Sequence, residues 1–179
     1  MASTHASDAA GRVYPMAPLI RSTLVALYLA LVLPLPLLAP DPLRPLMAAA
    51  VPLGLLLILA LVSEQVEIDA SGIRVGHPGW CRWLLRRGWN LGWDQITGLT
   101  AVSTSQGGRV YYVRSADGGA HLLPQRVARF EEFLDDVEQA SGLDLSGVGR
   151  ISPPWTYRLL ALLCWLLLAA EGLGFALVA

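Results

Sequence analysis

The stretch Leu91-Gly92-Trp93-Asp94-Gln95-Ile96-Thr97-Gly98-Leu99 lies in the middle of the one polar segment that is long enough to fold on its own. Glycine and aspartate are typical of turns, and β-branched residues such as Ile96 and Thr97 are typical of strands. The stretch therefore predicts a turn followed by a strand of a small β-domain. The rest of the chain has the composition of an anchor for that domain.

Further strands are predicted on both sides of this stretch. Apolar and polar residues alternate over residues 65–69, turn residues follow at 70–72, and the alternation resumes at 73–75, which predicts a hairpin. Residues 110–113 are strongly β-prone, and a turn at 117–119 leads into 120–123. Short strands around residues 83–85 and 89–91 are also expected, which gives a meander of about six or seven strands.

One amphipathic helix follows the strands. Pro124 suits a first helical turn, Gly142 suits a stop, and the apolar residues between them are spaced by threes and fours. The predicted apolar face consists of Val127, Phe130, Phe133, Leu134 and Val137. Arg126 and Arg129 fall in the expected first turn, where the helix dipole does not favour cations.

The order of these elements, with Trp93-Asp94-Gln95-Ile96 at its centre, resembles the bacterial pleckstrin-homology-like (PH-like) domains of small membrane proteins. The resemblance covers residues 65–143 and implies a small β-barrel or sandwich closed by one C-terminal helix. It also implies a binding or assembly scaffold beside two or three transmembrane helices. The layout is similar as well to that of the photosystem I assembly factor of cyanobacteria and chloroplasts, from which a third span departs.

Apolar runs at both ends predict that the chain crosses a membrane three times. Residues 22–39 carry no charge and extend about 27 Å as a helix, close to the hydrocarbon thickness of a bilayer. Residues 46–62 form a second run and residues 159–179 a third, interrupted by Glu171. We expect a disordered tail over 1–16, a transmembrane hairpin over 17–63, the PH-like domain over 64–143, a linker over 144–154 and the third transmembrane helix over 155–179. A cleaved signal peptide is the alternative for the first run.

Arginine sets the expected orientation, because the chain contains no lysine. Arg12 and Arg21 precede the first span, and the central segment carries most of the others, so the N-terminus and the central domain are expected to be cytoplasmic. The membrane is either a plasma membrane or a thylakoid membrane. A net charge of −1 at pH 7 gives no support for nucleic-acid binding.

The most unusual local composition is an interleaving of tryptophan and arginine. Such residues suit a membrane interface, where indoles lie at headgroup level and guanidinium groups meet phosphate, and they also suit a protein-docking surface. A third interpretation makes some of the tryptophans core residues and the arginines a solvated edge. The candidate contact residues are Trp80, Arg82, Trp83, Arg86, Arg87 and Trp89.

The remaining polar candidates are isolated. Glu171 lies inside the third apolar run, where an ionisable group is expensive, and Arg44 is its possible partner. Asp94 is expected to bond its own backbone amides in the turn. His77, His121, Cys81 and Cys164 match no catalytic or metal-binding spacing, so no cofactor, metal site or enzymatic activity is expected.

The sequence thus predicts a non-enzymatic integral membrane protein that presents a cytoplasmic PH-like scaffold domain at the membrane surface. Membrane lipids are the expected partners, with subunits of a membrane complex as a further possibility. The alternative function is that of an assembly factor for a photosynthetic or respiratory membrane complex.

Overall fold

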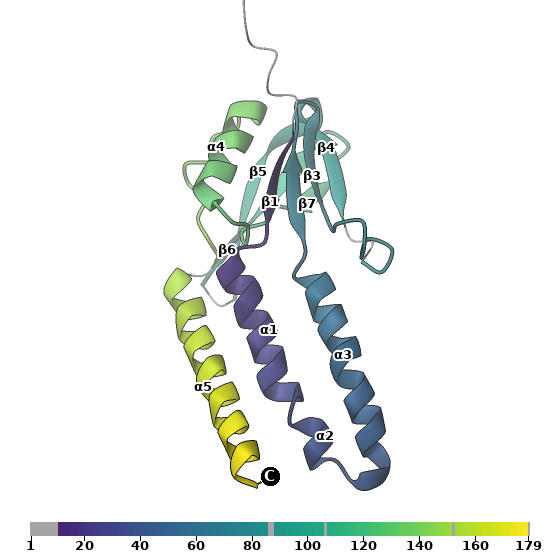
Figure 1. Ribbon diagram of the computed structural model, residues 1–179. Coiled ribbons are helices and arrows are strands. Elements are labelled where there is room, and N and C mark those ends of the chain that lie inside the picture. Colours follow the sequence, from purple (N-terminus) through teal and green to yellow (C-terminus); the bar gives the residue numbers. More distant parts are fainter. Residues whose placement is uncertain (1–10, 86–87, 106, 152, 179) are drawn as a thin grey trace, which may run out of the picture. The chain divides into compact units, whose positions relative to one another are not determined.

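The chain divides into two compact units in a computed structural model that describes residues 11–85, 88–105, 107–151 and 153–178. The β-unit comprises Met1–Ala17 and Glu64–Ser152, and the helical unit comprises Pro18–Ser63 and Pro153–Ala179. Figure 1 labels the elements of both. The chain leaves the β-unit after its first strand, forms two apolar helices and then returns.

A four-stranded antiparallel sheet opens the β-unit, with strand order β1-β2-β3-β4. Its strands are β1 (Arg12–Pro15), β2 (Gln65–Ile68), β3 (Gly72–Gly76) and β4 (Trp89–Gly92). The register aligns Tyr14 with Val66 and Val66 with Val75, so these side chains share the inner face and are buried. The polar residues between them, among them Glu67 and Arg74, lie on the outer face.

The expectation of a disordered tail over residues 1–16 is wrong for β1, while residues 1–10 lie outside the described residues. Tyr14 is fully buried, and β1 forms the edge of the sheet next to β2. Sequence patterning misses this strand because it is four residues long and is separated from its partner by the whole apolar hairpin.

A three-stranded antiparallel sheet completes the β-unit in the order β5-β6-β7. It contains β5 (Ile96–Ser103), β6 (Arg109–Ser115) and β7 (Ala120–Leu122). The turn η2 (Trp93–Gln95) joins the two sheets: its Trp93 indole N–H donates to the Asp69 carbonyl at 2.9 Å, and the Gln95 carbonyl accepts from the Ala116 amide at 2.8 Å. The predicted turn and strand are confirmed, although the sheets do not close into a barrel.

Two local expectations around this turn are wrong. Residues 83–85 form hydrogen-bonded turns instead of a strand. Within η2 the side chain that bonds the local backbone belongs to Gln95, whose Oε1 accepts from the Gly92 amide at 3.1 Å, whereas Asp94 makes no such bond with the described residues. The side chain of Gln95 is longer than that of Asp94 and starts one residue further along the turn, from where it reaches the Gly92 amide.

The helix α4 (Phe130–Ser141) packs against the inner faces of the sheets (Figure 1). Phe130, Phe133, Leu134 and Val137 are buried in one core with the inner strand residues, and Gly142 ends the helix at φ +71°. The helix begins at Phe130, six residues after Pro124. It cannot begin earlier, because Arg129 has a left-handed φ of +49°, which is incompatible with a right-handed helix.

The predicted linker over residues 144–154 belongs largely to the β-unit, which extends to Ser152. Leu145 and Val148 are buried in its core. The Tyr111 hydroxyl donates to the Gly147 carbonyl at 2.7 Å, and the Gln125 amide donates to the Gly149 carbonyl at 2.6 Å. The glycine content of this segment is typical of a flexible linker, but the buried side chains of Leu145 and Val148 hold it against the core.

The helical unit contains three helices long and apolar enough to cross a membrane, over Pro18–Leu38, Asp41–Leu61 and Trp155–Leu177. Its elements are α1 (Pro18–Val32), α2 (Leu35–Leu38), η1 (Asp41–Leu43), α3 (Arg44–Leu61) and α5 (Pro154–Val178). The predicted helical hairpin and C-terminal helix are therefore present.

Small residues and one tyrosine set the packing of these helices. Thr23, Ala26 and Ala30 are buried along α1, and the Thr23 hydroxyl lies 3.5 Å from the Tyr157 carbonyl of α5. On α3 the Val51 carbonyl accepts from the Tyr28 hydroxyl at 2.7 Å. A Cβ at Gly54 would lie 2.3 Å from that hydroxyl, so glycine is required for this close approach.

Candidate functional site at the connected end of the β-unit

One end of the β-unit collects all of its connections to the helical unit, and we call it the connected end. Pro15, Gln65 and Gly76 are aligned at this end of the first sheet. The Ala17 amide donates to the Arg126 carbonyl at 2.7 Å, which brings the residues after β7 to the same place. The Gln125 amide bonds both the Arg109 and Gly149 carbonyls, so the last connection starts here as well.

The segment between β3 and β4 also projects from the connected end, because Val75 is aligned with Trp89. This segment, residues 77–88, is called the Trp/Arg loop. The Pro78 carbonyl accepts from the Cys81 and Arg82 amides at 3.1 Å each, and the Cys81 carbonyl accepts from two later amides. These turns bury Cys81 and turn the neighbouring side chains outward.

The exposed side chains of the Trp/Arg loop are large and apolar. Trp80 is 55% exposed and Trp83 is 73% exposed, and the Trp83 indole N–H donates to the Trp80 carbonyl at 3.0 Å. Arg82 lies exposed between them. The structure thus brings together three of the predicted contact residues, while Arg86 and Arg87 lie outside the described residues.

The other two tryptophans of the polar segment have different surroundings. Trp89 is half-buried, with its ring centroid 5.3 Å from that of His121. Trp93 packs against the core at the far end of β4, where its indole is hydrogen-bonded. Both Trp89 and Trp93 are half-buried and pack against the core, so each lies between a core and a surface position.

A cleft of about 410 Å³ lies between the Trp/Arg loop and the outer face of β2, β3 and β4. Its sheet side presents Gln65, Glu67, Arg74 and Asn90. Glu67 accepts from the Gln65 amide at 2.9 Å and lies 3.7 Å from the Arg74 guanidinium. The loop contributes His77, Arg82 and Leu85, and Trp89 forms one wall.

Several polar groups of this cleft have no bonding partner among the described residues. The His77 Nδ1 atom is buried without one, and the Arg82 guanidinium and Asn90 amide form no hydrogen bond or ion pair there either. The sequence analysis missed the sheet side of the cleft. Its signal was the alternation over residues 65–69 and 73–75, which marks Gln65, Glu67 and Arg74 as sharing one face.

Charge is distributed unequally between the two ends of the β-unit. Arg82, Arg109 and Arg126 are exposed at the connected end. The opposite end carries exposed aspartates in its turns. A hydrogen bond from the Ser71 hydroxyl, followed by one from the Ser71 amide, lowers the pKa of Asp69, and the Ser115 hydroxyl and Gly119 amide do the same for the pKa of Asp117. Among the groups named here, the arginines lie at the connected end and the aspartates at the opposite end.

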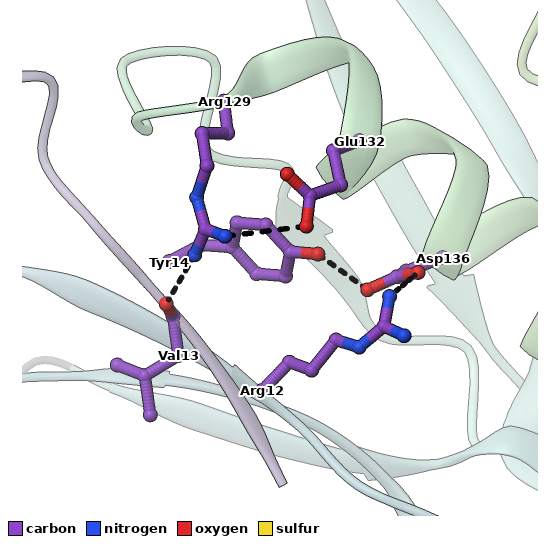
Figure 2. A network of polar contacts seen from close by, with 6 residues as sticks. All are labelled: Arg12, Val13, Tyr14, Arg129, Glu132 and Asp136. Carbon is purple, nitrogen blue, oxygen red and sulfur yellow. Dashed lines mark hydrogen bonds and ion pairs between the residues drawn. The ribbon is translucent and has the colours of Figure 1, made fainter.

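A polar network fastens β1 to α4 and is drawn in Figure 2. Asp136 accepts from the Arg12 guanidinium at 2.5 Å and from the buried Tyr14 hydroxyl. Burial, and then the bond to Asp136, raises the pKa of Tyr14 to about 12. The Arg129 guanidinium lies 5.1 Å from the centre of the Tyr14 ring and 3.2 Å from Glu132. Because the first segment of the β-unit ends at Ala17, three residues after Tyr14, this network holds the chain just before it leaves the unit.

The remaining predicted site residues stay apart from one another. Glu171 lies in α5 with its Oε2 atom buried and without a hydrogen-bond partner among the described residues. Its expected partner Arg44 instead pairs with Asp41 at 2.9 Å and bonds the Ala39 carbonyl. Within the described ranges no three His, Cys, Asp or Glu side chains are grouped to hold a metal ion.

Comparison with known proteins finds a close relative in a cyanobacterium. The chain is 40% identical over 165 residues to a protein of Synechocystis sp. (strain ATCC 27184 / PCC 6803 / Kazusa) described as "Uncharacterized protein slr0269", and the match covers 89% of this chain and 83% of the relative. The chain belongs to the slr0269 family. No protein-family model and no solved structure matches it.

The slr0269 match extends over more residues than either unit contains. The relative is therefore similar in parts of both the β-unit and the helical unit. The similarity to slr0269 is thus not confined to one of the two units.

Proposed function

We propose that this protein is a non-enzymatic membrane scaffold whose apolar helices span a bilayer and hold a PH-like β-unit at the cytoplasmic surface. The observation that carries the proposal is the position of the Trp/Arg loop at the connected end. Helix α1 begins, and helix α3 ends, at most four residues from the sheet, and four residues span at most about 14 Å. Helices that span a bilayer therefore bring this end close to the headgroups.

The chemistry of the connected end suits such a position. Indole rings prefer the interface between headgroups and hydrocarbon, and guanidinium groups bind lipid phosphate. Trp80 and Trp83 are the exposed indoles, and Arg82, Arg109 and Arg126 supply the positive charge. The same arginines favour the cytoplasmic side for the β-unit. The PH-like plan is supported by two antiparallel sheets followed by one helix that packs on both.

Strand pairing supports the hairpin arrangement independently. Because β1 and β2 form neighbouring strands of one sheet, Ala17 and Glu64 must lie on the same side of the bilayer. The chain between them must then cross an even number of times, as α1 and α3 do. If all three candidate spans cross the bilayer, the end of α5 lies on the opposite side.

Quenching of tryptophan fluorescence by brominated phospholipids tests the proposal. The full chain is reconstituted in bilayers whose lipids carry bromine near the headgroup. We expect the quenched share of the emission to fall in a Trp80→Phe/Trp83→Phe variant. The matched control is Trp93→Phe, because Trp93 lies at the opposite end of the β-unit. Equal quenching in wild type and loop variant would contradict the proposal.

Exposed tryptophan beside arginine also favours a second candidate, an assembly factor that docks on a photosynthetic or respiratory membrane complex, because these residues dominate protein interfaces. A pull-down in gentle detergent distinguishes the two. Co-elution of one defined complex with wild type, and its loss with a Trp80→Ala/Trp83→Ala variant, supports the assembly factor. If wild type and the variant both elute with lipid alone, the assembly-factor candidate is contradicted.

A further inference from the structure

We propose that the cleft beneath the Trp/Arg loop binds a phosphate ester, with Arg74 and Arg82 contacting the phosphate and Leu85 and Pro78 packing on its organic part. The inference deepens the proposed function, on which the membrane source of the ligand rests. It assigns a ligand class to a cavity that lies beside the bilayer-facing side chains and that none of them fills.

The cleft contains hydrogen-bond donors in excess of the acceptors present. The Arg82 guanidinium has five N–H groups and no partner among the described residues. Arg74 is 59% exposed and forms one loose ion pair, at 3.7 Å from Glu67, so most of its donors remain available. The Asn90 amide is unpartnered in the described part of the chain as well. An oxyanion with several acceptor oxygens satisfies these donors together.

The carboxylate of Glu67 repels a bound anion only weakly, because it already has a hydrogen bond and a nearby arginine. It accepts from the Gln65 amide at 2.9 Å and faces the Arg74 guanidinium. Its charge is offset by Arg74, which leaves the positive charge of Arg82 in excess. The buried Nδ1 atom of His77 adds a further polar group without a partner in the described structure. Because buried polar atoms are normally paired, the His77 Nδ1 atom is a group that a ligand in the cleft can satisfy.

The shape of the cleft suits an organic body attached to the phosphate. A volume of about 410 Å³ lies within the range of small-molecule pockets and exceeds what a free phosphate ion needs. Leu85 and Pro78 form apolar walls. Gly88 closes the loop over this space, because a Cβ there would lie 2.6 Å from the Val75 carbonyl.

Two sources can supply a phosphate ester at this place. The cleft opens at the connected end, where a glycerophospholipid headgroup is within reach if α1 and α3 span the bilayer. A soluble glycerol phosphate presents the same chemistry without a bilayer. The experiment therefore uses both probes on the full chain: sn-glycerol 3-phosphate by calorimetry in detergent, and phosphatidylglycerol against phosphatidylcholine by native mass spectrometry.

Three variants locate the site. Arg74→Gln/Arg82→Gln removes the proposed contacts, and we expect at least a tenfold weaker affinity. Asn90→Asp places a carboxylate on the same exposed wall without removing any packing, and we expect a comparable loss. Arg109→Gln is the matched control, because this exposed arginine lies at the connected end but outside the cleft.

Binding of either probe that weakens in the first two variants and persists in the control supports the inference. Phosphatidylglycerol alone then identifies a lipid source, and sn-glycerol 3-phosphate alone a soluble one. The inference is overturned if neither probe binds wild type, or if the control loses as much affinity as the cleft variants. The calorimetric arm needs no bilayer, so its failure is separate from a failure of the quenching experiment.

Discussion

At the residue scale, Tyr14 shows how a short strand can be held at the edge of a sheet. Its hydroxyl donates to Asp136 on α4 (Figure 2). Its ring packs edge-on against Phe133, with the ring centroids 5.5 Å apart. Arg12 binds the same carboxylate, and Arg129 lies over the ring. A buried hydroxyl with one strong acceptor keeps its proton, because the phenolate would face both burial and a carboxylate.

This environment predicts a pH dependence of stability. The pKa of Tyr14 rises from 10.0 to about 12 on folding, so the protonated side chain stabilises the folded chain. Since the folded pKa is the higher one, the contribution is complete below the unfolded pKa and is lost as the pH rises through the folded pKa. We expect the free energy of unfolding to fall by about 2 kcal/mol more in wild type than in Tyr14→Phe over this window.

Urea unfolding of the full chain in detergent at both ends of that window measures the difference. Tyr112→Phe is the control, because Tyr112 is only partly buried and no hydrogen bond of its hydroxyl is present among the described residues. An equal loss of stability in wild type and Tyr14→Phe would show that Tyr14 titrates normally.

At the element scale, helix α4 covers the inner faces of both sheets and shares one core with them. Its four buried apolar residues contact the inner strands, while its outer face is acidic. The β-unit should therefore depend on this helix much more than the helical unit does, since the helices are held by packing of their own.

Truncation of the α4 face tests this independence. Phe133→Ala creates a cavity at a fully buried position and should destabilise the β-unit by about 3–5 kcal/mol. We expect limited proteolysis to cleave the β-unit of this variant while α1, α3 and α5 stay intact. Glu131→Ala, on the exposed face of α4, is the control. Joint loss of both units on a single unfolding transition would contradict their independence.

The elements that the sequence predicted are those with a strong local pattern. Apolar runs gave the three long helices, strict alternation gave β2 and β3, and Gly142 marked the end of α4. Two features depended on contacts between distant residues and were missed. Strand β1 carries no recognisable alternation and finds its partner fifty residues later, and Leu145 and Val148 are ordered by the core rather than by their glycine-rich surroundings.

The candidate site was predicted in the same uneven way. Composition alone singled out Trp80, Arg82 and Trp83, because tryptophan interleaved with arginine is unusual. The sheet side of the cleft could not be assigned to a site, since Gln65, Glu67 and Asn90 are ordinary outward-facing residues until the loop folds over them. Their role follows from register and loop closure together.

At the scale of the whole molecule, the connectivity fixes the sidedness of the proposed arrangement. Sheet pairing requires the two ends of the helical hairpin to lie on one side, and the exposed arginines favour the cytoplasm. The α5 helix then carries the last described residues to the opposite side.

Topology reporters test this arrangement. Alkaline phosphatase, which is active only outside the cytoplasm, should be inactive when inserted in the exposed turn at Gly118 and active when fused after residue 179. A green fluorescent protein reporter should give the reverse pattern. Activity of the phosphatase at Gly118 would place the β-unit outside and contradict the proposed orientation.

The early position of β1 has a consequence for biosynthesis. In the proposed arrangement, the ribosome synthesises β1 before the α1–α3 hairpin that inserts into the membrane. At about 5–20 residues per second, β1 has no partner strand for several seconds, until β2 is synthesised. If α3 inserts with the wrong orientation, β2 lies on the other side of the bilayer and cannot pair with β1. Tyr14 and the inner faces of the sheets then stay exposed to proteases. In the proposed arrangement, strand pairing would therefore act as quality control, because only a correctly inserted chain could complete its first sheet.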